Sequence, residues 1–125
     1  MTPEELNQLS EKAIGCAFKV LNTLGAGFLE KVYENALCHE LRKAGLLVEQ
    51  QRKIEVYYDG VLVGSYVADL FVENILILEL KTVKAFEDAH LATAINYLKA
   101  TKLRLALLLN FAKPRLEIKR VVNEF

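Results

Sequence analysis

Cysteines, prolines and long apolar runs are scarce in this chain of 125 residues. The two cysteines, Cys16 and Cys38, lack the close CxxC spacing of a zinc or redox site, and two are too few for a disulfide framework. We therefore expect both to be reduced and packed in a core. Only two prolines, no low-complexity tract and 53% apolar residues exclude a disordered chain.

The apolar runs are also too short for a membrane protein. The longest, residues 75–78 and 105–109, fall far below the roughly 20 residues that a spanning helix needs. The first residues, MTPEELNQL, have no basic stretch followed by an apolar one, so they do not resemble a secretory signal. These features predict a soluble, cytoplasmic protein without membrane contact, folded as one domain over residues 1–125.

Net charge is zero, which argues against a protein that coats nucleic acid by bulk electrostatics. The charges are nevertheless unevenly distributed. Residues 1–80 hold seven Lys and Arg against twelve Asp and Glu, a balance of −5, whereas residues 81–125 hold nine against four, a balance of +5. This asymmetry permits a phosphate-binding face beside an acidic site, although such surface charge often serves solubility alone.

The periodicity predicts two helices followed by a sheet. Thr2, Pro3 and Glu5 form a capping signal before a helix that ends near Leu24, and a second helix begins just after Gly27. Alternation then predicts an antiparallel hairpin with its turn at residues 59–60, a central strand over 75–81, a third helix over 86–100, a strand over 103–111 and an edge strand over 116–122. The crossover through the third helix makes its two flanking strands parallel.

Two acids stand in strands that otherwise read as core. Glu79 lies within Ile-Leu-Ile-Leu-Glu-Leu, and Asp69 lies within Val-Ala-Asp-Leu-Phe-Val. An unpaired buried carboxylate costs several kcal/mol, so each needs compensation. Lys81 emerges on the same face as Glu79, and a plain ion pair between them is one solution. The other is a divalent cation held by both acids.

The hairpin turn at residues 73–74 decides between these readings. Asp69 lies directly opposite Glu79 only if the connection has three residues or contains a bulge. A strict two-residue turn would place the two acids on opposite sides of the sheet, which would exclude a shared ion.

Two carboxylates and a lysine suit phosphodiester hydrolysis. Carboxylates hold Mg²⁺, which neutralises phosphate charge and acidifies water, while a lysine orients the water or stabilises charge on phosphorus.

The same residues resemble a known family. Ala68-Asp69, nine intervening residues and Glu79-Leu80-Lys81 resemble the PD-(D/E)XK nuclease signature, with alanine where proline is often found. The segment Gly27-Phe28-Leu29-Glu30-Lys31-Val32-Tyr33 resembles the element that names the GxxExxY protein family within that superfamily. The resemblance covers about residues 25–120.

This resemblance implies an α/β, restriction-endonuclease-like αβββαβ core with a mixed sheet flanked by helices and an extra N-terminal helix. It implies Mg²⁺ or Mn²⁺ bound by Asp69, Glu79, the Leu80 backbone carbonyl and Glu30, with Lys81 assisting the attacking water. The substrate would be nucleic acid, most simply DNA, and a homodimer is suggested by analogy with small resolvase-like relatives. Basic residues that could contact phosphates are Lys84, Lys99, Lys102 and Arg104.

Several of these residues also have structural readings. Glu30 would favour the positive end of its helix in any fold. Tyr33 and Tyr97, adjacent to the expected site, lie on apolar helix faces and suit core packing with a bonded hydroxyl. His90 fits a surface position better than a catalytic one. Thr93, also adjacent to the site, stands where related sequences have glutamine.

Three functions follow from these alternatives. The first is a metal-dependent nuclease. The second is a binding or regulatory module that keeps the nuclease fold without turnover, a reading favoured by Thr93 and by the neutral net charge. The third assigns Glu79 and Lys81 to a purely structural ion pair.

Overall fold

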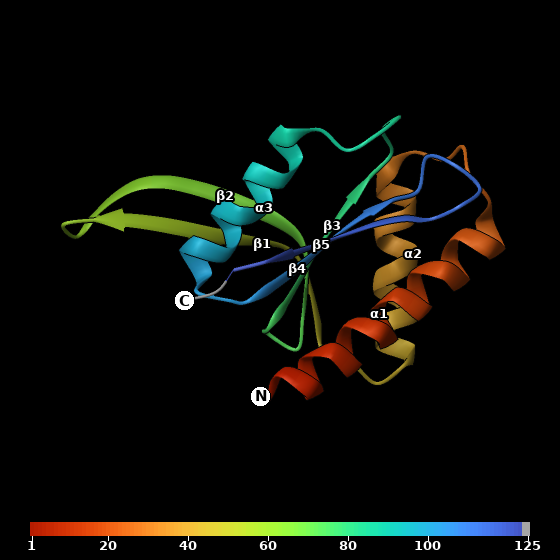
Figure 1. Cartoon of the computed structure of the whole chain (residues 1–125), viewed down its shortest axis with the longest axis horizontal. Helices are drawn as coiled ribbons and strands as arrows, with labels where there is room; N and C mark the ends of the chain where they lie inside the picture. The colour runs from red at the N-terminus through yellow and green to blue at the C-terminus, as the bar shows by residue number, and fades with distance from the viewer. Residues whose placement is uncertain (124–125) are drawn as a thin grey trace.

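The computed structural model describes residues 1–123 and consists of a mixed sheet between two layers of helices (Figure 1). Along the chain the elements are α1 (Pro3–Leu24), α2 (Glu30–Lys43), β1 (Val48–Tyr58), β2 (Val61–Val72), β3 (Leu76–Lys81), α3 (Asp88–Thr101), β4 (Leu105–Asn110) and β5 (Glu117–Val122). The strands lie in the order β1-β2-β3-β4-β5, with only the β3–β4 pair parallel. The predicted αβββαβ core with its extra N-terminal helix and edge strand is confirmed.

Local chemistry sets the helix ends as predicted. The Thr2 side chain accepts a hydrogen bond from the Glu5 backbone N–H, and the Glu5 carboxylate accepts one from the Thr2 backbone N–H, which completes a capping box at α1. Gly27, just before α2, has a φ of 114°, a backbone conformation that residues other than glycine rarely adopt. Gly45, with a φ of 85°, follows the C-cap residue Ala44 and ends α2.

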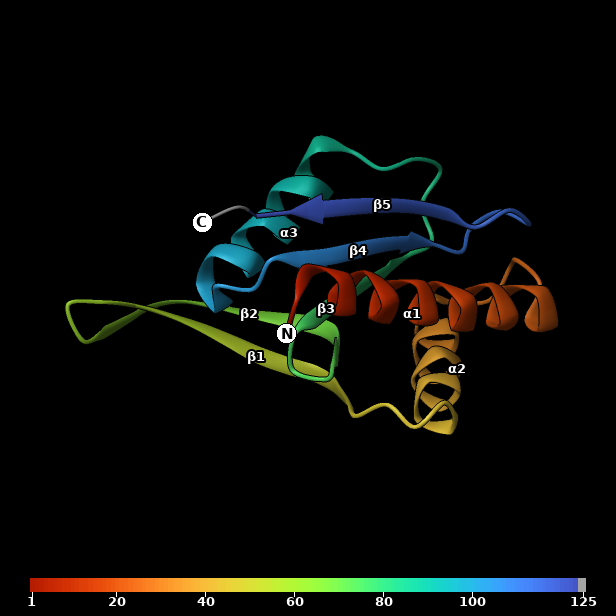
Figure 2. The same ribbon diagram turned by 60° about the horizontal axis from the view of Figure 1, so that its bottom comes forward.

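Two apolar cores hold the layers together. The first lies between the sheet and helices α1 and α2, and the second lies between the sheet and α3. Figure 2 shows the arrangement of these helices around the sheet. In β3 the leucines 76, 78 and 80 face the first core, whereas Ile77 faces the second. By the alternation of strand side chains, Glu79 and Lys81 point to the α3 side of the sheet.

Helical spacing places Phe18, Leu29 and Val32 with the apolar stripes of α1 and α2, but all three side chains are exposed. Leu29 is the N-cap of α2 and therefore lies outside the helical repeat. The other two lie at the edges of their apolar stripes, where the helix surface turns toward solvent.

The cysteines partly fit their prediction. Both are free, and Cys38 is buried whereas Cys16 is only half-buried. Burial raises the pKa of both thiols. Among residues 1–123, no helix combines the length and the apolar character needed to cross a membrane.

The β1–β2 hairpin is long and extends beyond the helical layers (Figure 1). Its turn residues, Asp59 and Gly60, have φ angles of 53° and 77°, as a tight hairpin turn requires. Beyond the layers its apolar side chains meet no covering helix, so Tyr57, Tyr58, Val61, Leu62 and Val63 are exposed.

Candidate active site

The connection between β2 and β3 has the length that brings the two acids together. Val72 pairs with Leu76, which leaves the three residues 73–75 as the loop, and Leu70 pairs with Leu78. The next position in this register sets Asp69 opposite Glu79. Glu73 and Asn74 make the turn with φ angles of 53° and 59°. The condition that the sequence set for a shared site is therefore met.

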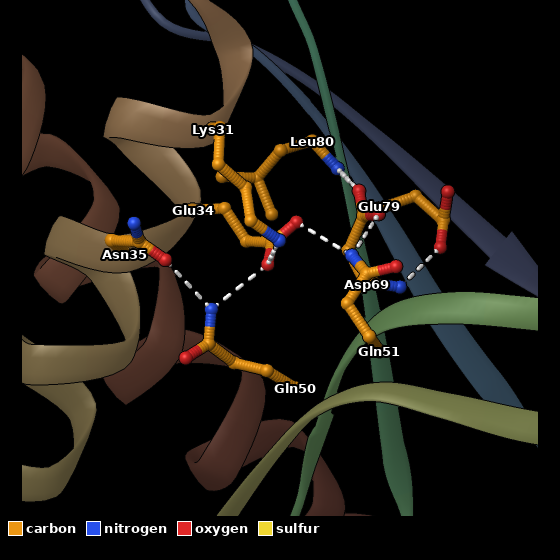
Figure 3. A network of polar contacts seen from close by, with 8 residues as sticks. All are labelled: Lys31, Glu34, Asn35, Gln50, Gln51, Asp69, Glu79 and Leu80. Carbon is orange, nitrogen blue, oxygen red and sulfur yellow. Dashed lines mark hydrogen bonds and ion pairs between the residues drawn. The ribbon is translucent and has the colours of Figure 1, made fainter.

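The backbone ladder between β2 and β3 stops at the Leu70–Leu78 pair, and the two carboxylates replace it. The Asp69 backbone N–H donates to Glu79 Oε1 at 2.7 Å, and the Leu80 backbone N–H donates to Asp69 Oδ2 at 2.8 Å (Figure 3). Each acid thus binds the strand that carries the other. This crossed pair of bonds fixes both carboxylates at the point where the strands separate.

The Leu80 peptide borders the same gap. Its N–H points at Asp69, and within a strand the N–H and C=O of one residue point in the same direction. The Leu80 carbonyl, which the resemblance assigns as a ligand, therefore faces the space between β2 and β3.

β2 also changes face at Asp69. Ala68 packs in the second core and Leu70 in the first, although residues two apart in a regular strand share a face. The backbone of the partner strand β1 is irregular at the same place, because Gln51, opposite Asp69 in the β1–β2 register, has a φ of 53°. This twist turns Asp69 out of regular alternation and toward the groups on α2 and β3.

Burial makes these carboxylates reluctant to ionise. Burial, reinforced by the charge of Asp69, raises the pKa of Glu79 from 4.5 to about 8. Burial also raises the pKa of Asp69, where the Leu80 N–H opposes the shift. Carboxylates in this condition bind a divalent cation in exchange for their protons, so metal binding should strengthen as the pH rises.

Glu30 joins this acidic group from the first turn of α2. Burial and then the charge of Asp69 raise its pKa, and Lys81 and the Thr82 backbone N–H lower it. Glu30 thus shares the electrostatic environment of the two strand acids. Within residues 1–123, no three Asp, Glu, His or Cys side chains are placed closely enough to hold one ion together.

The donor set nevertheless fits a hard cation. Mg²⁺ is usually held by one or two protein carboxylates and keeps several waters, and Asp69, Glu79 and the Leu80 carbonyl are all oxygen donors.

Lys81 lies beside the acids and half-buried. Its charge lowers the pKa values of Glu79, Asp69 and Glu30, which places its ammonium within electrostatic reach of all three. It forms no ion pair with Glu79 in the part of the chain that the structure describes, since the lysines paired there are Lys19, Lys31 and Lys43. The structural ion pair offered as an alternative is therefore absent from residues 1–123.

The two tyrosines have structural contacts. Tyr33 is buried, stacks on Phe111 with ring centroids 4.9 Å apart, and donates its hydroxyl to the Gly25 carbonyl at 2.6 Å. The Tyr33 hydroxyl oxygen also accepts a hydrogen bond from the Phe28 N–H at 3.1 Å, so Tyr33 fixes the loop that leads into Glu30. Tyr97 donates to the Val67 carbonyl at 3.1 Å, and burial followed by the charge of Glu79 raises its pKa.

Two other helix residues serve their own helix. Thr93 is exposed and its hydroxyl donates to the Ala89 carbonyl at 2.9 Å. His90 accepts from the Glu87 backbone N–H through Nδ1 at 2.9 Å, so it caps α3.

The predicted phosphate-binding residues do not form one group. Lys84 follows Val83, whose N–H and C=O are both bonded to the Asn110 side chain beside the end of β3. Lys99, in the last turn of α3, and Lys102, its C-cap, are exposed. Arg104 precedes Leu105 at the far end of β4, about 20 Å along the strand direction from Asn110. Only Lys84 is brought to the end of the sheet that carries the acids.

Glu34 is a second fully buried acid, after Glu79, and the sequence did not lead us to predict it. It pairs with Lys31 at 2.7 Å and accepts from the Gln50 and Gln51 amides at 2.8 Å each. Gln51 also donates to Asp69 Oδ1 at 3.3 Å (Figure 3). An acid four residues after Glu30 on a core-facing helix was a signal for this network, whereas nothing in the sequence indicates the backbone angle of Gln51.

Comparison with family models decides the relationship. The model described as the PD-(D/E)XK nuclease superfamily matches residues 7–121. The chain belongs to the PD-(D/E)XK nuclease superfamily. Membership in this superfamily indicates nuclease activity and a nucleic acid substrate, and PD-(D/E)XK nucleases generally use divalent metals. Comparisons with curated proteins and with solved structures each found no match.

Proposed function

We propose that this PD-(D/E)XK protein is a Mg²⁺- or Mn²⁺-dependent nuclease that hydrolyses phosphodiester bonds in DNA, and that it is a member of the GxxExxY family. The observation that carries the proposal is the crossed pair of bonds by which Asp69 and Glu79 face each other across β2 and β3. Two acids in apolar strands are costly unless function requires them there.

Asp69, Glu79 and the Leu80 carbonyl would hold the ion, and Glu30 would add negative charge from α2. A divalent ion supplies Lewis acidity here, because it offsets the phosphate charge and acidifies water. Lys81 emerges two residues after Glu79 on the same face, where its ammonium can hold the attacking water and stabilise negative charge on the phosphate oxygens. Tyr33 maintains the loop that sets the position of Glu30.

The motif of the GxxExxY family acquires a physical reason in this arrangement. Gly27 supplies a φ of 114° that turns the chain into α2, and Tyr33 closes that turn through its hydroxyl. Glu30 lies between them, in the first turn of the helix and near Asp69. Gly27 and Tyr33 would thus fix the position of Glu30 relative to Asp69.

DNA is proposed as the substrate because the basic balance of residues 81–125 follows directly after the acidic site. The Asn110 side chain bonds the backbone of Val83 and so keeps the neighbouring Lys84 near the end of β3, where Lys84 would contact a phosphate. Lys99, Lys102 and Arg104 would contribute weaker phosphate contacts, because they lie farther from the acids.

Cleavage assays test the proposal. Purified protein is incubated with plasmid, linear and branched DNA in Mg²⁺, Mn²⁺ or EDTA. We expect metal-dependent cleavage that falls at least about a hundredfold in Asp69→Ala and Glu79→Ala, as loss of a metal ligand should. Glu11→Ala, which removes an exposed carboxylate from α1, is the matched control and should cleave like the wild type. Equal cleavage by all four proteins would refute the assignment.

A second candidate function is a nuclease-fold module that binds DNA without cutting it. The Thr93 hydroxyl favours it, because that side chain bonds within its own helix and not toward the acids. The discriminating result is DNA binding without cleavage in the wild type, with cleavage appearing in Thr93→Gln. Cleavage by the wild type would exclude this candidate.

We also propose a homodimer formed through the exposed apolar end of the β1–β2 hairpin. Five apolar side chains there have no cover within residues 1–123, and a contiguous exposed apolar surface is characteristic of protein contacts. Light scattering after size exclusion should give the mass of two chains, and Leu62→Glu should give one. A wild-type monomer at micromolar concentration would refute the dimer.

A further inference from the structure

The amide of Gln51 connects two acids that belong to different layers. Its Nε2 donates to Glu34 Oε1 at 2.8 Å and to Asp69 Oδ1 at 3.3 Å (Figure 3). Glu34 belongs to α2 and Asp69 to β2. A primary amide has two hydrogens on its nitrogen, so one group can serve both carboxylates at once.

The Glu34 end of this connection is fixed. Its side chain is 4% exposed, and Lys31 and the Gln50 amide both bind its Oε2. Gln50 donates in addition to Asn35 Oδ1 at 2.9 Å. A buried carboxylate with donors on both oxygens has little freedom to move, so it can serve as the anchor for Gln51.

The backbone of Gln51 is shaped for the same contact. Its φ of 53° lies in the left-handed region, which is unusual for a residue other than glycine, asparagine or aspartate. Gln50 and Arg52 on either side keep the regular register with Leu70 and Ala68, so the irregularity is confined to the residue opposite Asp69. Backbone strain of this kind is characteristic of positions where the surrounding structure demands it.

We propose that Gln51 is a positioning residue that holds the Asp69 carboxylate in its metal-binding orientation, with Glu34 as its anchor. This inference rests on the proposed function, since it takes Asp69 as a metal ligand. The Leu80 N–H fixes Asp69 Oδ2 from the β3 side, and Gln51 fixes Oδ1 from the β1 side. α2 thereby acts on the site twice, through Glu30 directly and through Glu34 by way of Gln51.

The neighbouring glutamine provides a matched control. Gln50 and Gln51 both bind Glu34, but only Gln51 contacts Asp69. Gln50→Ala therefore removes a contact from the anchor alone, whereas Gln51→Ala removes the contact to the proposed ligand as well. Gln51→Gly separates the effect of losing the side-chain amide from the effect of backbone strain, because glycine adopts a positive φ without strain.

Calorimetric titration of the apo proteins with Mn²⁺ tests the inference. We expect Gln51→Ala and Gln51→Gly to weaken Mn²⁺ binding by about tenfold or more, the range seen when an outer-shell partner of a ligand is removed. Gln50→Ala should stay within about twofold of the wild type. Urea unfolding should rank Gln51→Gly as more stable than Gln51→Ala, so the shared loss of affinity cannot come from unfolding.

Each other outcome counts against the inference. Wild-type affinity in both Gln51 variants would overturn it while leaving the metal site intact. Equal weakening in Gln50→Ala and Gln51→Ala would assign the effect to Glu34 alone and would also overturn it. Mn²⁺ binding absent from the wild type, or unchanged in Asp69→Ala, would refute the proposed function and the inference with it.

Discussion

Replacing Glu79 by glutamine should change how the stability of the apo protein depends on pH. Burial and the charge of Asp69 raise the pKa of Glu79 from 4.5 to about 8 in the folded protein. Between these two values the folded state binds a proton that the unfolded state has released. The free energy of unfolding therefore falls as the pH rises, by up to about 1.4 kcal/mol per pH unit.

The size of the effect follows from the two pKa values. Their difference of roughly 3.5 units corresponds to about 5 kcal/mol at most, fully present below pH 4.5 and lost as the pH passes 8. This is a large part of the total stability of a small domain. Glutamine does not titrate and keeps a carbonyl oxygen that can accept the Asp69 N–H, so Glu79→Gln should escape the loss.

Urea unfolding in EDTA at intervals from pH 5 to 8.5 measures this difference. We expect Glu79→Gln to match the wild type near pH 5 and to exceed it by at least about 2 kcal/mol at pH 8.5. Glu11→Gln, at an exposed position, should follow the wild type throughout. Mn²⁺ at a hundredfold excess over its Kd should restore about 2.7 kcal/mol to the wild type at pH 8. Parallel curves for wild type and Glu79→Gln would refute the argument that burial suppresses ionisation of this acid.

Three further predictions concern the groups around the acids. Tyr33→Phe removes the hydroxyl that bonds Gly25 and Phe28 and should lower the free energy of unfolding by about 1–3 kcal/mol in a urea titration; an unchanged midpoint would contradict that role. Gly27→Ala should cost about 1–2 kcal/mol in the same assay, because no atom lies within 4 Å of the added methyl group and only the φ of 114° opposes it. Asn110→Ala frees the Val83 backbone and should lower DNA cleavage with little change in Mn²⁺ affinity, measured by gel assay and calorimetry; a parallel loss of metal binding would place Asn110 in the metal site instead.

The order and type of the elements could be predicted because the local signals agree with the fold. The capping box at Thr2, the turn at residues 59–60 and the apolar run of β3 each specify one structure, and all three occur. Boundaries differ by about two residues where ends carry no strong signal, as at α3, which begins at Asp88.

The site could be predicted in part for the same reason. A charged residue in an apolar strand is visible in the sequence, and the crossed bonds of Asp69 and Glu79 account for both such positions. Gln51 could not be found this way, since its importance depends on a backbone angle and on a contact with Glu34 seventeen positions away. The sequence also could not show that Arg104 lies at the opposite end of β4 from the acids.

The most direct test of the proposed metal site is anomalous diffraction from crystals grown near pH 8 and soaked in Mn²⁺. We predict one strong anomalous peak bounded by the carboxylates of Asp69 and Glu79 and the carbonyl of Leu80, and its loss in Asp69→Ala. Saturating Mn²⁺ that leaves the space between these two acids empty would contradict the metal-dependent nuclease proposed for this chain.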